Sequence, residues 1–184
     1  MLRSLQVLKM LALGIFFALA APRLNDFLMA VSQERGEGGQ AIAALSNGDY
    51  QYCSKPDPID GRDEDGVCFI LKKTDKTIAG YYGYPNSDNY ICIRGTADAN
   101  QIQGEGLALS WPGAYWAKIP NVEFTWDAEG HLKLSKGEII RSANEGTERL
   151  DWVRFHKAML NIRNFYRYRS PRMTSPSQLC DWPK

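Results

Sequence analysis

The sequence predicts a mainly β protein: a small antiparallel β-barrel or meander, stapled by disulfides and followed by a C-terminal amphipathic helix. Three observations support this fold class. Short runs of alternating apolar and polar residues, separated by turn residues, follow one another from Gly48 to Leu109, as in strands joined by hairpins. Three of the four cysteines lie in this stretch. Nearer the C-terminus, apolar residues recur at helical spacing.

The composition is that of an ordinary globular protein, with 44% hydrophobic and 23% charged residues. A length of 184 residues suits one domain with a real core. The net charge of +1 conceals an uneven distribution, because residues 149–172 hold seven basic side chains and one acid, Asp151. We therefore expect an acidic body and a basic C-terminal segment.

Residues 1–20 have the layout of a secretory signal peptide. A basic start with Arg3 and Lys9 leads into an apolar run that is too short to span a bilayer comfortably. Ala18 and Ala20 supply the small residues that cleavage requires. We expect a secreted protein that is released into a periplasm, a lumen or the extracellular space. The alternative is a protein anchored by an uncleaved N-terminal segment.

Residues 21–44 are expected to be a flexible linker. The part from Ser32 to Gln40 is polar and glycine-rich and has no apolar period. The rest of the chain, residues 45–184, is expected to form a single barrel-like domain whose tail is tethered by a disulfide.

An acidic loop follows the first expected strand, which contains Tyr50. Asp60, Asp63 and Asp65 offer the hard oxygen ligands that Ca²⁺ prefers. Their spacing differs from an EF-hand loop, in which Lys72 would occupy the position of the bidentate glutamate. These three aspartates are the calcium candidates of the chain, and a solvated acidic loop is the alternative.

Four further strands are expected between residues 67 and 109. They cover 67–73, 77–84, 90–96 and 101–109. Gly104 and Gly106 fall on the apolar face of the last of these strands, and small inward residues suit the curvature of a closing barrel. Beyond them we expect a hairpin over 122–135 and an edge strand at 138–142.

Residues 148–166 are predicted to form the amphipathic helix. Five apolar residues recur there at three- and four-residue spacing: Trp152, Phe155, Met159, Ile162 and Tyr166. The rival interpretation is a last strand at 152–157, because Val153 and Phe155 alternate with charged residues.

The basic residues of this segment are candidates for docking to an acidic protein or an anionic lipid surface. They are Arg154, Lys157, Arg163, Arg167 and Arg169. The alternative is a solvated basic face with no partner. Nucleic acid is not expected as a partner, because the chain is expected to be exported.

The four cysteines are expected to form two disulfides, because an exported chain enters an oxidising compartment. Three connectivities are possible. We favour the pairs Cys53–Cys68 and Cys92–Cys180. The second pair would hold the C-terminal tail against the central strand. A zinc site is not expected, because the sequence has no CxxC or CxxH spacing.

Catalytic motifs are missing from the sequence. It contains no GxSxG, HExxH, P-loop or Rossmann fingerprint. We therefore expect a non-enzymatic protein without a cofactor. A hydrolase that uses a carboxylate pair is the alternative, and the acids that could supply it are Glu105, Glu123, Asp127 and Glu129.

Aromatic residues are the candidates for binding a small apolar ligand in the barrel, because they combine apolar bodies with polar tips. The candidates are Tyr50, Tyr52, Tyr82, Tyr84, Trp111 and Trp116. Ordinary packing of the barrel is the alternative role for these side chains.

Two resemblances agree with this picture. The run FILKKTDKTIAGYYGYPNSDNYICIRGTADANQIQGEGL, within residues 67–109, resembles the strand-turn-strand units of small lipocalin-like barrels. The chain lacks the GxW motif with which lipocalins begin. Over residues 48–170, including the FYRY stretch, it is similar to uncharacterised exported proteins of cyanobacterial type. These resemblances imply an exported barrel that holds a small apolar ligand.

Overall fold

The computed structural model describes residues 40–58, 66–85, 87, 89–110, 118–145, 148–172 and 180. The predicted signal peptide and most of the linker lie outside the described residues. Trp111, Trp116 and the calcium candidates Asp60, Asp63 and Asp65 also lie outside them. Within the described part of the chain, no helix is long and apolar enough to cross a membrane.

The described residues form a short 3₁₀ helix and nine strands. In chain order they are η1 (Ile42–Ala44), β1 (Gly48–Cys53), β2 (Cys68–Thr74), β3 (Thr77–Gly83), β4 (Tyr90–Asp98), β5 (Gln101–Ser110), β6 (Phe124–Thr125), β7 (Leu132–Glu145), β8 (Glu148–Asn161) and β9 (Tyr166–Arg167).

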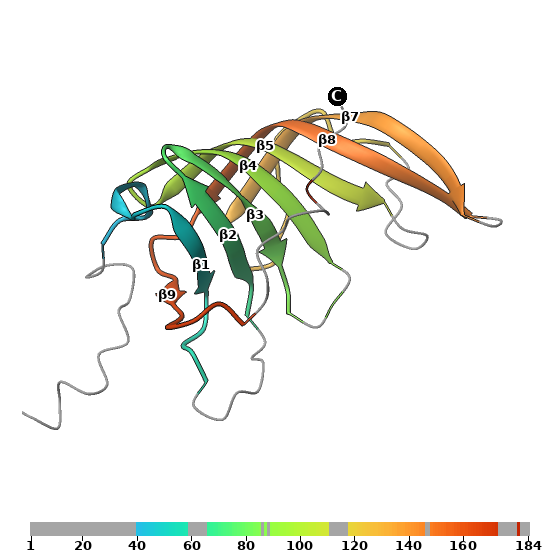
Figure 1. Cartoon of the computed structure of the whole chain (residues 1–184). Coiled ribbons are helices and arrows are strands. Elements are labelled where there is room, and N and C mark those ends of the chain that lie inside the picture. The colour runs from blue at the N-terminus through green and yellow to red at the C-terminus, as the bar shows by residue number, and fades with distance from the viewer. Residues whose placement is uncertain are drawn as a thin grey trace, which may run out of the picture. The chain divides into compact units, whose positions relative to one another are not determined.

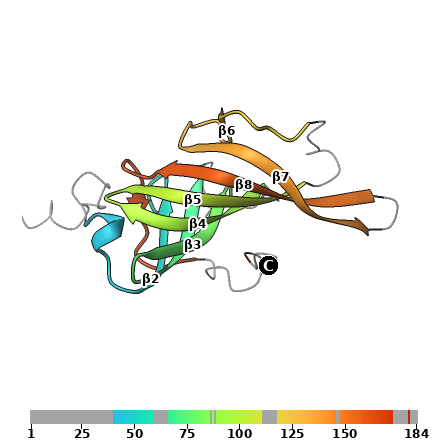
Figure 2. The same ribbon diagram turned by 90° about the horizontal axis from the view of Figure 1, so that it is seen from above.

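All nine strands belong to one antiparallel sheet in the order β6-β7-β8-β5-β4-β3-β2-β1-β9. The sheet curls into a half-barrel (Figures 1 and 2). Strands β1 to β5 follow one another as a meander, as the sequence predicts. The hairpin of β7 and β8 then adds to β5 through β8.

The two faces of the sheet differ in character. One face, called the core face below, carries a buried cluster that includes Phe69, Tyr82 and Phe155, each fully buried. Burying a side chain of this size contributes about 1.5–3 kcal/mol, so this cluster is the main source of stability. The opposite side is called the outer face. Successive strand residues alternate between the two faces.

The prediction of a helix at 148–166 is wrong, because Glu148–Asn161 forms strand β8. The rival interpretation of a strand is correct, although the strand is longer than expected. A β-bulge explains the misleading pattern: Gly106 pairs with Phe155 and Gly104 with Ala158, so β8 has one extra residue between them. The buried positions therefore step by three residues from Phe155 to Ala158, which imitates helical spacing.

The hairpin predicted at 122–135 is present. Strand β6 pairs with the start of β7, and Leu134 lies opposite Phe124. The predicted edge strand at 138–142 is the second half of the long strand β7. Asp127 closes the turn, because its carboxylate accepts hydrogen bonds from the backbone N–H groups of His131 (3.2 Å) and Leu132 (2.8 Å).

The two disulfides join the pairs that the sequence analysis favoured. Cys53 and Cys68 lie opposite each other on β1 and β2. Cys92 on β4 is joined to Cys180 in the C-terminal tail. The two links span 15 and 88 residues of sequence, and chain entropy gives such links roughly 3 to 5 kcal/mol. Disulfides of this kind indicate an oxidising compartment.

Candidate functional site

The four described tyrosines of the predicted ligand site lie together on the core face. Tyr52 and Tyr82 belong to the buried cluster, and Tyr50 and Tyr84 pack against it. Tyr82 has no exposed surface and its ring meets that of Trp126 at 5.7 Å. The geometry of Tyr52 and Tyr82 is thus that of core packing, the alternative role considered for these side chains.

The Tyr82 hydroxyl points into a buried polar spot beside Asp127. Burial raises the pKa of Tyr82 far above its usual range, and the nearby Asp127 carboxylate raises the pKa further. This phenol therefore stays protonated at physiological pH. Each Asp127 oxygen also accepts one backbone N–H group of the turn. The arrangement anchors the β6–β7 hairpin on the core.

Further contacts hold the same hairpin against β2 and β3. The backbone N–H of Ala128 donates to the Tyr84 hydroxyl at 3.2 Å. The N–H of Val67 donates to Glu129 at 3.2 Å. Tyr84 is thus a structural contact for the turn.

The four carboxylates considered for hydrolysis are each engaged by a different base or backbone group. Glu105 pairs with Arg94 and Glu123 with Lys133. Asp127 and Glu129 accept backbone N–H groups, as described above. Among the described residues, no group of three or more His, Cys, Asp or Glu side chains is placed to hold a metal ion.

The basic residues predicted for docking are divided between two places. Arg154 and Lys157 lie on β8, and Lys157 is exposed on the outer face. Arg163 and Arg169 are exposed in the segment after β8. Arg167 lies over the ring of Tyr50 at 5.0 Å from its centroid. They do not share a helix face, since the helix does not form.

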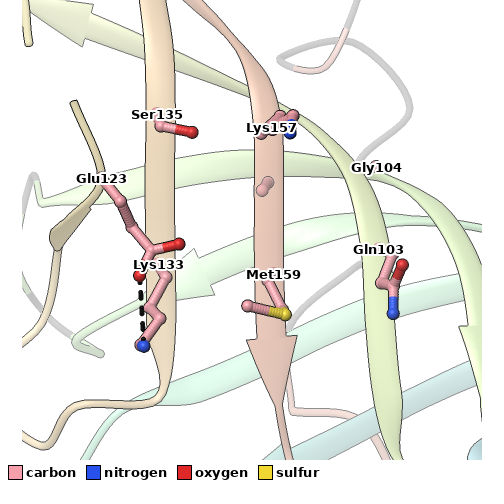
Figure 3. A pocket seen from close by; sticks show the side chains of 8 residues that line it. Gln103, Gly104, Glu123, Lys133, Ser135, Lys157 and Met159 are labelled. Atoms are coloured by element: carbon pink, nitrogen blue, oxygen red, sulfur yellow. Dashed lines mark ion pairs between the residues drawn. The ribbon is translucent and has the colours of Figure 1, made fainter. Parts of the chain in front are cut away.

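Among the described residues, a candidate site is a hollow of about 340 Å³ on the outer face of β5, β7 and β8 (Figure 3). Its lining consists of Gln103, Gly104, Glu123, Lys133, Ser135, Lys157, Ala158 and Met159. We call it the outer hollow.

The register of the strands explains which side chains meet there. Lys133, Met159 and Gln103 lie in one row across β7, β8 and β5. The adjacent row belongs to the buried cluster and consists of Leu132, Leu160 and Ile102. Because neighbouring rows face opposite ways, the first row faces outward.

A second row completes the outer hollow. Ser135 lies opposite Lys157 on the neighbouring strand. Lys157 belongs to the bulge of β8, where both it and His156 are exposed. The short side chain of Ser135 leaves space between the longer side chains of the lining (Figure 3).

The two lysines of the outer hollow differ in their surroundings. Lys133 forms an ion pair with Glu123 at 3.2 Å, and both side chains are about half exposed (48% and 56%). Among the residues that the structure describes, no carboxylate forms an ion pair with Lys157. Its ammonium group is the lining charge most available to a ligand.

A chain of polar side-chain contacts runs across the outer face beside the hollow. Arg94 pairs with Glu105 at 3.0 Å, and His156 lies 2.8 Å from Glu138 and 3.9 Å from Glu105. These contacts link β4, β5, β8 and β7. They engage Glu105 and Glu138, and neither of these described carboxylates forms an ion pair with Lys157.

Sequence reasoning placed Lys157 in a docking face but missed the outer hollow. Its lining residues are spread from Gln103 to Met159 and form no motif. The available signal was the spacing of Lys157 and Met159, which share a face only if the segment is a strand. The helical interpretation of that segment concealed it.

Comparisons of the chain with models of known protein families, with curated proteins and with solved structures find no match. The case for a function therefore rests on the geometry of the site.

Proposed function

We propose that the chain is an exported, non-enzymatic binding protein whose small ligand occupies the outer hollow. The observation that carries the proposal is the hollow itself, a concave site with two lysines, an amide and a hydroxyl converging on it. Small-molecule sites are typically concave and mostly apolar with a few placed polar groups, and the largely polar lining of this hollow therefore favours a polar ligand. A volume of about 340 Å³ lies near the lower end of the usual range of about 300–1,000 Å³.

The outer face is favoured over the interior for a physical reason. The rings of Tyr52 and Tyr82 are packed in the core with Phe69, so a ligand there would have to displace well-packed side chains. Displacing them would forfeit packing that is worth several kcal/mol. The ligand of our proposal is therefore polar and binds outside the half-barrel.

Export is supported by two independent features. The N-terminal layout with Arg3, Lys9 and the Ala18-x-Ala20 site is that of a signal peptide. The two disulfides fit an oxidising destination such as a periplasm, a lumen or the extracellular space.

A variant that fills the hollow tests the proposal. Ser135→Tyr adds a ring within the hollow and changes no charge. We expect it to abolish binding of the small polar metabolites that the wild-type protein retains in native mass spectrometry. Thr77→Tyr, at an exposed position on β3, is the matched control and should bind as the wild type does. Equal binding by the Ser135→Tyr protein would refute the outer hollow as the site.

A second candidate function is docking of an acidic protein or an anionic lipid surface. The observation that favours it is the location of Arg154 and Lys157 on one strand, β8, where Lys157 is exposed and Arg154 is partly exposed. Replacing both by glutamine should then weaken binding to anionic vesicles at low salt. Unchanged binding would eliminate this candidate.

A further inference from the structure

We propose that the outer hollow recognises a sugar-sized ligand through an oxyanion, a carboxylate or phosphate group that sits between Lys157 and Lys133. The inference rests on the proposed function and specifies the chemistry of the ligand. It starts from the charges of the lining, which comprise two ammonium groups and the single carboxylate of Glu123.

Lys157 is the primary anchor in this proposal. Two other carboxylates of the outer face, Glu105 and Glu138, are engaged by Arg94 and His156, and no described carboxylate forms an ion pair with Lys157. An ammonium without a partner at the rim of a hollow attracts an anion, and its three N–H donors can each serve an oxygen atom. Ser135 lies directly opposite and adds a hydroxyl donor.

Lys133 is the secondary anchor, because its present partner can be exchanged. Exposed pairs such as Lys133–Glu123 contribute little, so a ligand oxyanion can replace the glutamate at small cost. Figure 3 shows Lys133 on β7 and Lys157 on β8 on the same side of the sheet, and Met159 on β8 is the neighbour of Lys133 in its row. The negative charge of Glu123 repels the oxyanion of the ligand. Removing the Glu123 charge is therefore predicted to strengthen binding.

The remaining lining fits the polar body of such a ligand. The Gln103 amide and the Ser135 hydroxyl can both donate and accept hydrogen bonds, as sugar hydroxyls require. The lining residues among the described part of the chain include no aromatic ring, so stacking on a sugar face is not the source of affinity. The volume of about 340 Å³ suits one sugar ring.

The experiment is an amide NMR titration of the full mature protein with four probes: glucuronate, glucose 6-phosphate, inorganic phosphate and glucose. Glucuronate or glucose 6-phosphate should shift the amide signals of Gln103, Ser135 and Lys157, with a dissociation constant of the order of 1 mM. Glucose should bind at least about tenfold more weakly, and raising the salt concentration should weaken the binding of the acids. A carboxylate preference or a phosphate preference identifies the source of the oxyanion.

Two charge variants are expected to change the affinity for the acid in opposite directions. Lys157→Gln should weaken binding of the preferred acid about five- to tenfold, and Glu123→Gln should strengthen it about two- to threefold. Lys76→Gln, at the exposed β2–β3 turn, is the control and should change nothing. Circular dichroism of each variant confirms that it is folded.

The outcomes separate the inference from the proposed function. If Lys157→Gln binds as the wild type does, or if glucose binds as well as the acids, the oxyanion inference is overturned. Inorganic phosphate that binds as tightly as both sugar acids would indicate an adventitious ion only and would also overturn it. If no probe binds but Ser135→Tyr still abolishes retention of another metabolite, the inference falls and the proposed function stands.

Discussion

Gly95 on β4 and Gly104 on β5 face each other so closely that neither position has room for a side chain. A Cβ atom on Gly104 would collide with the carbonyl group of Arg94, and one on Gly95 with the carbonyl group of Gln103. Backbone atoms cannot rotate away, as the end of a flexible side chain can. The close approach of these two strands also fixes β5 beneath the outer hollow, since Gln103 and Gly104 belong to its lining.

Gly104→Ala should therefore destabilise the protein strongly, by about 3 kcal/mol, the upper part of the usual range for overpacking. Urea unfolding measures this. Gly106→Ala is the control, because its Cβ would meet only the side-chain ends of Ile91 and Leu134 at 3.1 Å. We expect a smaller loss there. Equal losses at both positions would contradict the close approach of the two strands.

Phe155→Ala should cost about 3–5 kcal/mol, the usual range for removing a large aromatic side chain from a core. Phe155 is fully buried and its ring meets that of Phe124 at 5.6 Å. Met159→Ala is the comparison, because Met159 lies on the outer face and is only partly buried. It should cost much less. Thermal unfolding separates the two results, and similar losses would contradict the assignment of these residues to opposite faces.

Much of the sheet could be predicted because the local sequence pattern of strands and turns agrees with the strand pairing in the folded sheet. The meander from β1 to β5 has alternating residues and turn residues in the expected places, and both disulfides join the pairs that were favoured. The segment from Glu148 could not be assigned correctly, because the bulge between Phe155 and Ala158 adds one residue to a period of two. Only the pairing partner on β5 reveals that extra residue.

The outer hollow could not be predicted for a related reason. It depends on three strands whose neighbours are set by tertiary pairing, and β8 lies between β5 and β7 although β7 precedes it in sequence. Residues such as Ser135 and Gln103 belong to no sequence motif that indicates a ligand-binding site. The tyrosine cluster was easier to recognise, but composition alone could not distinguish a ligand-binding wall from the packed core that Tyr82 occupies.

The link between Cys92 and Cys180 should be the more stabilising of the two disulfides. It closes the longer stretch of chain, 88 residues against 15, and loop entropy grows with that length. Replacing both of its cysteines by serine should cost roughly 4.6 kcal/mol, against about 3 kcal/mol for Cys53 and Cys68. Urea midpoints of the two double variants check the order, and the reverse order would show that native-state effects outweigh chain entropy.

Asp151 should make stability depend on pH in acid solution. Its carboxylate accepts a hydrogen bond from the Ser142 hydroxyl at 2.5 Å and another from Arg149 at 2.8 Å. The Ser142 bond, followed by the Arg149 bond, lowers the pKa of Asp151 below its usual value of 3.8. The folded state therefore favours the ionised carboxylate. This contribution is complete above the unfolded-state pKa and disappears as the pH falls through the lower folded-state pKa.

Unfolding free energies measured by urea titration between pH 6 and pH 2 test this linkage. Asp151→Asn should be less stable than the wild type at pH 6, and the gap should narrow towards pH 2, because the wild type then loses the same interaction. Ser142→Ala removes the larger cause of the lowered pKa, so its acid-induced loss of stability should be smaller and should end at a higher pH than in the wild type. A gap between wild type and Asp151→Asn that stays constant from pH 6 to pH 2 would show that the carboxylate is not linked to folding, and the hydrogen bonds from Ser142 and Arg149 would then serve only to order the β7–β8 hairpin.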